Sequence, residues 1–241
     1  MKQPLILPLK WDSDFFNLSI GKINDEAKFS NITKRMLDKY DLVYIEHLNK
    51  KKCTELLNSD QFNITFTDQK TIYQKKIKGE PTLLNEKVSI YPLKSASKQL
   101  VALSIQAGNF SRFKLDTNFK KELYKKLYTQ WIKNSVEKKS ADILLVYGNY
   151  KNPQGFITLV FKENLVQIGL IAVDHLHQNK GIGKDLIQAA EFFAKKNNFN
   201  TLQVITQTIN ENACMFYEKQ GFKKQVLIYT HHHWKKHANT I

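Results

Sequence analysis

Apolar residues form short runs and helix-like repeats along the C-terminal half of the chain. The runs at 143–147, 156–161 and 166–173 each have the apolar and β-branched content of a buried strand. Apolar positions over 181–196 recur with the period of a helix, and a fourth run follows at 202–206. A helix that crosses between two strands of one sheet implies that these strands run parallel. We therefore expect a sheet with at least one parallel pair.

Other elements of this half are marked by the residues at their ends. Ser95 is a candidate cap for a helix that ends at Gly108, and Gly221 is placed to end a short helix. Apolar residues at helical spacing predict one further helix. These elements are helices over 119–132 and 210–220, and strands over 88–93 and 222–229.

The N-terminal half has a weaker pattern. Ser30 is a candidate cap for a helix through Lys39, and residues 11–14 have the composition of a turn. The run Lys78-Gly79-Glu80-Pro81 interrupts the regular pattern, so we place a domain boundary between this run and Val88. The chain then divides into a smaller α/β domain over 1–87 and a larger domain over 88–241. The other predictions are strands at 20–23 and 42–46, a helix at 50–58 and extended structure at 63–77.

The composition is that of a globular protein. Hydrophobic residues make up 42% of the chain, and no long uninterrupted apolar stretch predicts a signal peptide or a membrane span. The two cysteines, Cys53 and Cys214, do not provide a framework of disulfide bridges. We therefore expect a soluble cytoplasmic protein without a membrane partner.

The formal net charge of +15 favours a negatively charged ligand but does not by itself identify it. Many of the lysines, such as Lys120, Lys121, Lys125 and Lys126, have the spacing of a solvated helix face. No zinc-finger spacing, helix-turn-helix or RNA-binding signature accompanies them, so nucleic acid is not a predicted partner. A positive field also suits a small polyanionic ligand.

A glycine-containing loop joins the strand at 166–173 to the helix that follows. The first amides of a helix have no partner within it, and the dipole there is positive, so such a position binds anions. Gly181 and Gly183 would let a diphosphate approach the backbone closely. Taken alone, a Gly-x-Gly pair also serves to tighten a strand-to-helix turn. A Rossmann motif lacks its third glycine here, and a Walker motif fails because Asp185 follows Gly183-Lys184.

Two motifs together resemble the GNAT superfamily of acetyltransferases. The run Gln178-Asn179-Lys180-Gly181-Ile182-Gly183, after a strand that ends Leu-Ile-Ala-Val, is similar to its acetyl-CoA signature. The stretch 210–222 is similar to its second signature, Asn-x-x-Ala-x-x-Phe-Tyr-x-x-x-Gly-Phe, about thirty residues later. The resemblance extends from Val88 to the C-terminus. It implies an α/β (α+β) GNAT fold with a mixed central sheet and splayed parallel strands, after the smaller α/β domain.

This resemblance implies acetyl-CoA as the cofactor and assigns roles to its residues. Amides of the 178–184 loop would hold the pyrophosphate, and the Ile171 N–H would polarise the thioester carbonyl. Tyr217 matches the general acid, because a tyrosine of pKa ~10 can protonate a thiolate whose thiol has a pKa of ~8.5. Helical packing for Tyr217 and simple N-capping for Asn210 stay open as alternatives. The cofactor-binding residues implied are Ile171, Ala172, Val173, Gln178, Asn179, Lys180, Gly181, Ile182, Gly183, Lys184, Asn210 and Phe216.

The sequence gives no decisive general base and no metal site. His175 and His177 lie near the cofactor loop, but loop histidines are often bystanders. Adjacent residues of the run 231–233 point to opposite faces of a strand, and neither His237 nor a nearby carboxylate completes a tetrahedral set. We therefore predict no metal.

Shorter matches resemble TDP-fucosamine acetyltransferases, which acylate a 4-amino-4,6-dideoxyhexose (here 4-amino-4,6-dideoxygalactose) on a nucleotide. These matches are residues 9–16 with 20–23, and residues 108–113 with Asp116. Arg112 is one of two arginines in the chain, and its planar fork suits a phosphate or carboxylate. The alternative that Arg112 is only a surface base between core residues stays open. So do the alternatives that the aspartates of the first match only cap a turn and that its aromatic residues belong to the core. The substrate-binding residues implied are Arg112, Asp12, Asp14 and Phe15.

Together these features predict an N-acetyltransferase. It would move an acetyl group from acetyl-CoA to the amine of an amino-deoxy sugar nucleotide, by direct attack in a ternary complex. The alternatives are another small-molecule or protein amine as acceptor, or a non-catalytic sensor of acyl-CoA. The sequence leaves open whether the chain forms a homodimer.

Overall fold

A mixed β-sheet runs through the whole described part of the protein. The structure is a computed structural model that describes residues 4–23, 31–48, 60, 62–79 and 84–236. Its ten strands lie in the order β1-β2-β3-β10-β4-β9-β8-β7-β6-β5. The strands are β1 (Leu7–Pro8), β2 (Ile20–Ile23), β3 (Leu42–His47), β4 (Ile64–Lys76), β5 (Val88–Ile90), β6 (Ile143–Tyr147), β7 (Gly155–Phe161), β8 (Val166–Val173), β9 (Thr201–Gln207) and β10 (Lys223–Trp234).

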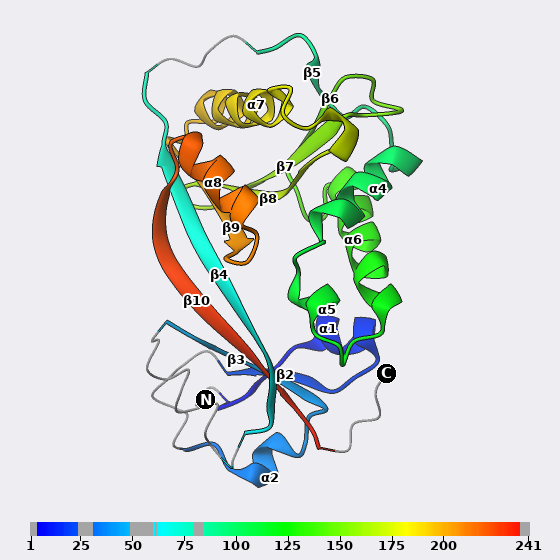
Figure 1. Cartoon of the computed structure of the whole chain (residues 1–241), viewed down its shortest axis with the longest axis vertical. Coiled ribbons are helices and arrows are strands. Elements are labelled where there is room, and N and C mark those ends of the chain that lie inside the picture. Colours follow the sequence, from blue (N-terminus) through cyan, green and yellow to red (C-terminus); the bar gives the residue numbers. More distant parts are fainter. Residues whose placement is uncertain (1–3, 24–30, 49–59, 61, 80–83, 237–241) are drawn as a thin grey trace.

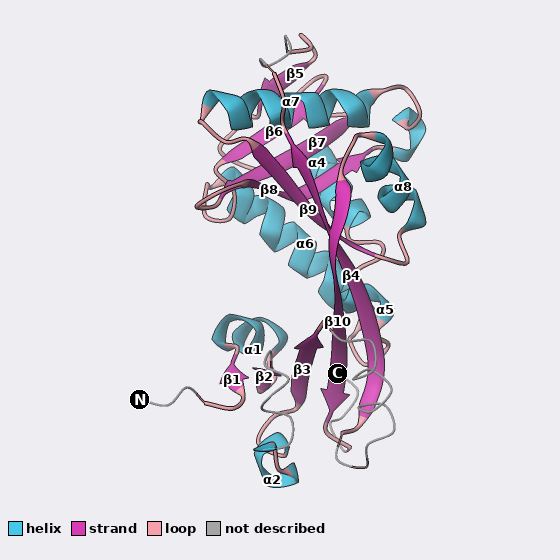
Figure 2. Ribbon diagram, turned by 90° about the vertical axis from the view of Figure 1, so that its left-hand side faces the viewer, coloured by secondary structure: helices cyan, strands magenta, loops and turns pink. Residues whose placement is uncertain are grey.

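Helices cover both faces of the β5–β9 part of the sheet. Side chains of a strand alternate between faces, and Leu145 of β6 packs with α7 residues while Leu144 and Val146 pack with α4 residues. Figures 1 and 2 show α7 and α4 on opposite sides of these strands. The helices are α1 (Lys10–Phe16), α2 (Lys34–Leu37), α4 (Lys98–Ala107), α5 (Arg112–Leu115), α6 (Lys121–Val136), the 3₁₀ turn η2 (His175–His177), α7 (Ile182–Lys196) and α8 (Glu211–Lys219).

Two long antiparallel strands, β4 and β10, connect the upper and lower parts of the molecule (Figure 2). The first half of β4 lies beside the second half of β10, which also pairs with β3 from Tyr229↔His47 to Trp234↔Leu42. The second half of β4 pairs with β9. Segments before and after residue 88 therefore share one sheet, and the domain boundary placed there stays a prediction.

The parallel strands β8 and β9 separate after a short stretch of pairing. Their register runs only from Val166↔Leu202 to Ile168↔Val204, although both strands continue beyond it. A register shift between β7 and β8 lies at this point, and there the Leu170 N–H donates to Thr158 Oγ1 (2.7 Å). The splayed parallel strands predicted from the motifs are confirmed, and the gap between them exposes two backbone edges.

Most predicted elements of the C-terminal half are present, with corrections at their ends. The helix expected from Ser95 begins later, because the side chain that caps it belongs to Ser97 and accepts the Leu100 N–H (3.2 Å). Strand β10 continues past residue 229 to Trp234, because β3 and β4 both pair with it there. Strand β5 is shorter than predicted and ends at Ile90.

The N-terminal half departs further from the prediction. Residues 11–14 belong to helix α1 instead of a turn, with Asp12 in its first turn and Asn17 closing it in the left-handed region (φ 53°). The helix expected over 30–39 is helical only over Lys34–Leu37, and its proposed cap Ser30 lies outside the described residues. The helix predicted at 50–58, with Cys53, also lies outside them.

Within these described ranges, no helix has both the length and the apolar character needed to cross a bilayer.

Three consecutive histidines of β10 are buried in the lower sheet. His231 Nδ1 lies 2.8 Å from Thr67 Oγ1, and His233 Nδ1 accepts the Asn63 N–H at 2.8 Å. A ring nitrogen that accepts a hydrogen bond carries no proton, so His233 is held in a neutral form. Burial lowers the pKa of His231 and of His233 to about 4.

We expect acid to destabilise the fold through these histidines. In the unfolded chain each binds a proton below its ordinary pKa of ~6.5, whereas the folded chain resists protonation down to about 4, so stability falls as pH drops between these values. At ~1.4 kcal/mol per pKa unit, the free energy of unfolding should fall by a few kcal/mol. Urea unfolding at about pH 7 and pH 5 measures this. His233→Asn keeps an acceptor but does not titrate, so its difference between the two pH values should be smaller. An unfolding free energy equal at both pH values would contradict the expectation.

Candidate active site

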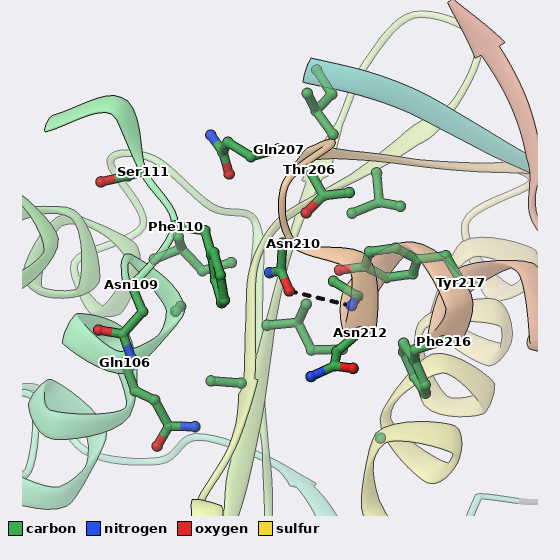
Figure 3. A pocket seen from close by; sticks show the side chains of 18 of the residues that line it. Gln106, Asn109, Phe110, Ser111, Thr206, Gln207, Asn210, Asn212, Phe216 and Tyr217 are labelled. Carbon is green, nitrogen blue, oxygen red and sulfur yellow. Dashed lines mark hydrogen bonds between the residues drawn. The ribbon is translucent and has the colours of Figure 1, made fainter. Parts of the chain in front are cut away.

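A cavity of about 1170 Å³ lies where strands β8 and β9 separate. It runs from the loop before α7, past the end of β9 and the helix α8, to the segment between α4 and α5 and the lower sheet. Figure 3 shows the α4–α5 side chains Gln106, Asn109 and Phe110 facing Asn210 and Tyr217 across it. The site is therefore built from both halves of the chain.

The loop at one end of the cavity presents backbone donors. In the part of the chain that the structure describes, no hydrogen bond uses a backbone N–H between Gln178 and Lys184; the first helical amide with a partner is that of Asp185, which bonds to the Gly181 oxygen. Asn179 (φ 60°) and Gly181 (φ 82°) both adopt the left-handed region, which bends the backbone sharply where these amides lie. Such a cradle at the N-terminus of a fifteen-residue helix fits a diphosphate.

Gly183 permits a close approach at this loop. A Cβ at Gly183 would lie 3.1 Å from two ring carbons of Phe216, which packs on the loop from α8. With a Cβ at this position, either the Phe216 ring or the first turn of α7 would have to move.

We therefore expect Gly183→Ala to weaken CoA binding by ~10-fold, or ~1.4 kcal/mol, because the donors of the cradle move relative to one another. Isothermal calorimetry with CoA measures this. The double variant Gly183→Ala/Phe216→Leu removes the ring edge and should recover part of the loss. Unchanged affinity in Gly183→Ala would contradict the close-approach argument.

The exposed edge of β8 forms the middle of the cavity. Ile171, Ala172 and Val173 line it beyond the last residues that pair with β9. The Val173 carbonyl accepts the side-chain amides of Gln106 (2.7 Å) and Gln178 (3.3 Å). An extended arm placed in the gap would meet a strand edge, as an added strand does.

Tyr217 of α8 lines the cavity from the opposite side. Its ring packs against Tyr73, Phe216 and Phe222, and Figure 3 shows its hydroxyl end directed toward Asn210 and the cavity. Burial raises the pKa of Tyr217, so the phenol keeps its proton. The residue thus packs through its ring and presents a protonated hydroxyl to the cavity.

Asn210 caps helix α8, as one sequence interpretation held. Its Oδ1 accepts the Ala213 N–H at 3.3 Å, and the residue also lines the cavity. His175 and His177 lie on η2 beside Asp174, and His177 reaches the cavity at its loop end.

Arg112 occupies the other end of the cavity, at the start of α5. Its guanidinium lies 4.3 Å from the ring centre of Tyr44 and 4.8 Å from that of Phe113, and NH1 lies 3.8 Å from Glu46 Oε1. The side chain is 13% exposed, yet among the described residues its Nε and NH1 have no hydrogen-bond partner. Burial also raises the pKa of the neighbouring Tyr44.

A row of polar side chains forms the sheet surface under this end. We call Lys22, Glu46, Asp68, Lys70 and Gln207 the polar floor. Cross-strand partners point to the same face, and the pairs Glu46↔Thr230, Thr230↔Asp68 and Lys70↔Gln207 connect β3, β10, β4 and β9. Of these, Glu46, Lys70 and Gln207 line the cavity.

The charges of the polar floor are interdependent. Burial opposes the charge of Glu46, but Lys22 (2.5 Å), Lys70 (3.6 Å) and Arg112 (3.8 Å) outweigh it and lower its pKa. Burial raises the pKa of Asp68 and lowers that of Lys70 to about 8. The floor thus holds opposite charges close together with little water.

Several buried polar atoms near Arg112 lack a partner. Within the described ranges these include Tyr44 Oη, Asp68 Oδ2, Ser111 Oγ and His232 Nε2, besides the two nitrogens of Arg112. A buried polar atom without a hydrogen bond costs ~1–3 kcal/mol, so native proteins normally satisfy it with protein, water or ligand. Their concentration here fits a site for a polar molecule.

The structure brings most sequence-predicted site residues to this one cavity. Lys180, Asp14 and Phe15 do not line it: Lys180 Nζ donates to the Leu176 oxygen (3.1 Å), and Phe15 stacks on Trp11 with ring centres 5.1 Å apart. Those that line it are Asp12, Arg112, Ile171, Ala172, Val173, Gln178, Asn179, Gly181, Ile182, Gly183, Lys184, Asn210, Phe216 and Tyr217. Burial raises the pKa of Asp12 despite the nearby Arg112.

Sequence reasoning missed Glu46, Lys70 and Gln106. Glu46 had a usable signal, because a carboxylate that ends the apolar run Leu-Val-Tyr-Ile is costly to bury unless cations pair with it. Lys70 and Gln106 had none, since many lysines and amides share their local pattern.

Residues 109–222 match the model of the acetyltransferase (GNAT) family. Streptothricin acetyltransferase A of Bacillus subtilis is 44% identical over 52 residues, which are 22% of this chain and 30% of that protein. The curated relatives that the chain matches align over 30% to 55% of their own length, so the chain spans well under two thirds of them.

Solved structures share the fold at low identity. A functionally unknown conserved protein of Staphylococcus epidermidis aligns with a TM-score of 0.64 at 12% identity, over 98% of this chain and 93% of that one. A GCN5-related N-acetyltransferase of Kribbella flavida aligns with a TM-score of 0.53 at 10% identity, over 90% and 81%. Residues 109–222 are therefore similar to the acetyltransferase (GNAT) family, and the chain shares the GNAT fold.

Proposed function

We propose that the protein is an acetyl-CoA-dependent N-acetyltransferase whose acceptor is a small polar amine. One observation carries the proposal: a single cavity joins the amide cradle before α7, the Tyr217 hydroxyl and the polar floor. A donor with a diphosphate fits the first, and a polar acceptor fits the last.

Residues at different places along the cavity have different roles in the proposed reaction. Bound acetyl-CoA would supply the acetyl group as a thioester. The amides at the start of α7 hold the diphosphate, and the N–H of Ile171 polarises the thioester carbonyl from the β8 edge. Tyr217 Oη donates a proton to the departing sulfur. Packing around the Tyr217 ring keeps this donor in one position.

The acceptor we propose in detail is a nucleotide-linked amino sugar. Arg112 offers unpaired N–H groups to a phosphate, and the partly exposed rings of Trp11 and Phe110 line the cavity beside it, where a base can stack. The polar floor offers carboxylates and amides to sugar hydroxyls. The related streptothricin acetyltransferase, named for a small molecule, also supports a small acceptor.

Release of the CoA thiol, measured with acetyl-CoA and a panel of amines, tests both the acetyltransferase activity and the proposed acceptor. We expect turnover with TDP-linked 4-amino-4,6-dideoxyhexoses, and a higher KM for the same sugars without the nucleotide. Turnover on peptide or other amines alone would remove the proposed acceptor. Absence of CoA binding in calorimetry would remove the acetyltransferase itself.

A further inference from the structure

Lys70 lies at the centre of the polar floor, between the two ends of the cavity. Its register partners are Gln207, the last residue of β9, and Ile228 of β10, and all three line the cavity. The strand β9 ends where it has separated from β8, beside the edge that carries Ile171. Through its pairing with Gln207, Lys70 is thus the residue of the polar floor next to the gap between β8 and β9, where acetyl transfer would occur.

The surroundings of Lys70 favour its neutral form. Burial is the main cause, and the nearby charge of Arg112 adds to it, while Glu46 (3.6 Å) and Asp68 act in the opposite direction. The more distant cation of Lys22 also disfavours the ammonium. Its pKa is lowered to about 8, so about a tenth of the molecules have a neutral amine at pH 7 and about half at pH 8.

The other proton acceptors around the cavity are less suitable. Glu46 is engaged by three cations that lower its pKa, which makes it a weak base. Asp12 lies beside Arg112 on helix α1, which contacts β2, and in the sheet order β3, β10 and β4 separate β2 from β9. His177 stands at the cofactor loop, within 3.9 Å of Asp174. The charge of Lys70 acts on His232, but His232 is fully buried and its Nδ1 is hydrogen-bonded to Asp116.

We propose that Lys70 accepts the proton that the acceptor amine must lose before it attacks. The inference rests on the proposed acetyltransferase function. Lys70 Nζ takes one proton from the acceptor's ammonium, which leaves a neutral amine with a free electron pair. As the C–N bond forms and the C–S bond breaks, Tyr217 Oη gives its proton to sulfur and takes one from the attacking nitrogen. The amide nitrogen keeps one hydrogen, and Lys70 returns its proton to solvent.

Variants at Lys70 separate a base from a structural charge. We expect Lys70→Gln to lower kcat by ~10²-fold and to abolish the rise of kcat with pH around 8. Lys70→Arg should be equally slow, because arginine keeps the charge beside Glu46 but does not release its proton. Lys76→Gln, an exposed change on the same strand, is the matched control and should keep the wild-type profile. Wild-type activity in Lys70→Arg, or an unchanged pH profile in Lys70→Gln, would overturn the inference.

A titration of the CoA-free protein gives a readout independent of turnover. In protein with ¹³C-labelled lysines, one side-chain resonance that is missing from Lys70→Arg should titrate near pH 8, well below the ordinary lysine pKa of ~10.4. A Lys70 resonance that titrates at the ordinary value would overturn the inference even if the enzyme is active. If the wild type turns over and the Lys70→Arg variant is equally fast, Lys70 is rejected as the base, while the proposed acetyltransferase function stands. A wild type that binds no CoA rejects the proposed function, and Lys70 as base with it.

Discussion

Tyr217→Phe should lower kcat by ~10²–10³-fold while leaving the KM for acetyl-CoA near its wild-type value. The change removes one hydroxyl and keeps the ring that packs against Tyr73 and Phe222. The thiolate must then depart without a proton donor in the cavity wall. In the proposed site, backbone amides at the other end would hold the diphosphate, so we expect affinity for the donor not to depend on this hydroxyl.

Steady-state kinetics and calorimetry with CoA measure the two effects separately. Tyr124→Phe is the matched control, since Tyr124 of α6 is also a buried tyrosine but does not line the cavity. We expect wild-type rates for that variant. A Tyr217→Phe enzyme with wild-type kcat would restrict Tyr217 to packing, which is the alternative that the sequence left open.

The cofactor half of the site was predictable because its parts are close in sequence. Strand β8, the glycine loop and helix α7 follow one another directly, and α8 comes after one further strand. Each element carries its own signal: apolar runs for the strands, Gly181 at the turn, and Asn210 at a helix start. Local rules therefore sufficed for these elements, whereas the roles of their residues came from the resemblance to the two GNAT motifs. The structure brings most of these residues to one cavity.

The acceptor half was not predictable in the same way. The residues of its polar floor come from β2, β3, β4 and β9, and β10 connects β3 to β4 through pairings such as Glu46↔Thr230 and Thr230↔Asp68. No local pattern states that a strand near the C-terminus inserts between two strands from the N-terminal third. Arg112 was identified from a short resemblance at 108–113 and from the rarity of arginine in this chain, whereas its partners Tyr44 and Glu46 emerged only with the structure.

The histidine run shows the same limit. Adjacent histidines on a strand were expected to point to opposite faces, and they do find different partners: Thr67 for His231 and Asp116 for His232. What the sequence did not indicate is that the strand is central, with β3 on one side and β4 on the other. Central position buries all three rings and gives His232 a structural role.

Asp116 joins the segment after α5 to the end of β10. Its Oδ2 accepts hydrogen bonds from His232 Nδ1 (2.6 Å) and from Trp234 Nε1 (2.9 Å), and its Oδ1 accepts from the backbone and side chain of Asn118 (3.0 and 2.8 Å). Burial is the largest single influence and opposes the charge, but the hydrogen bond and charge of His232, with the hydrogen bonds from Asn118 and Trp234, together outweigh it and lower the pKa of Asp116. Arg112 lies one helical turn earlier, so this carboxylate also holds the Arg112 end of the cavity in place.

Asp116→Ala should therefore lower the free energy of unfolding by ~3–5 kcal/mol, because it leaves two buried donors without an acceptor. Asp116→Asn keeps the shape and one acceptor oxygen, so its loss should be smaller. Urea unfolding measures both, with Asp142→Ala as the matched control, since among the described residues that exposed carboxylate accepts only the Phe161 N–H (2.7 Å). The folded fraction of Asp116→Ala should still bind CoA through the distant amide cradle but bind the acceptor poorly. Wild-type stability in this variant would mean that the buried donors find water instead, and that Asp116 does not hold the two segments together.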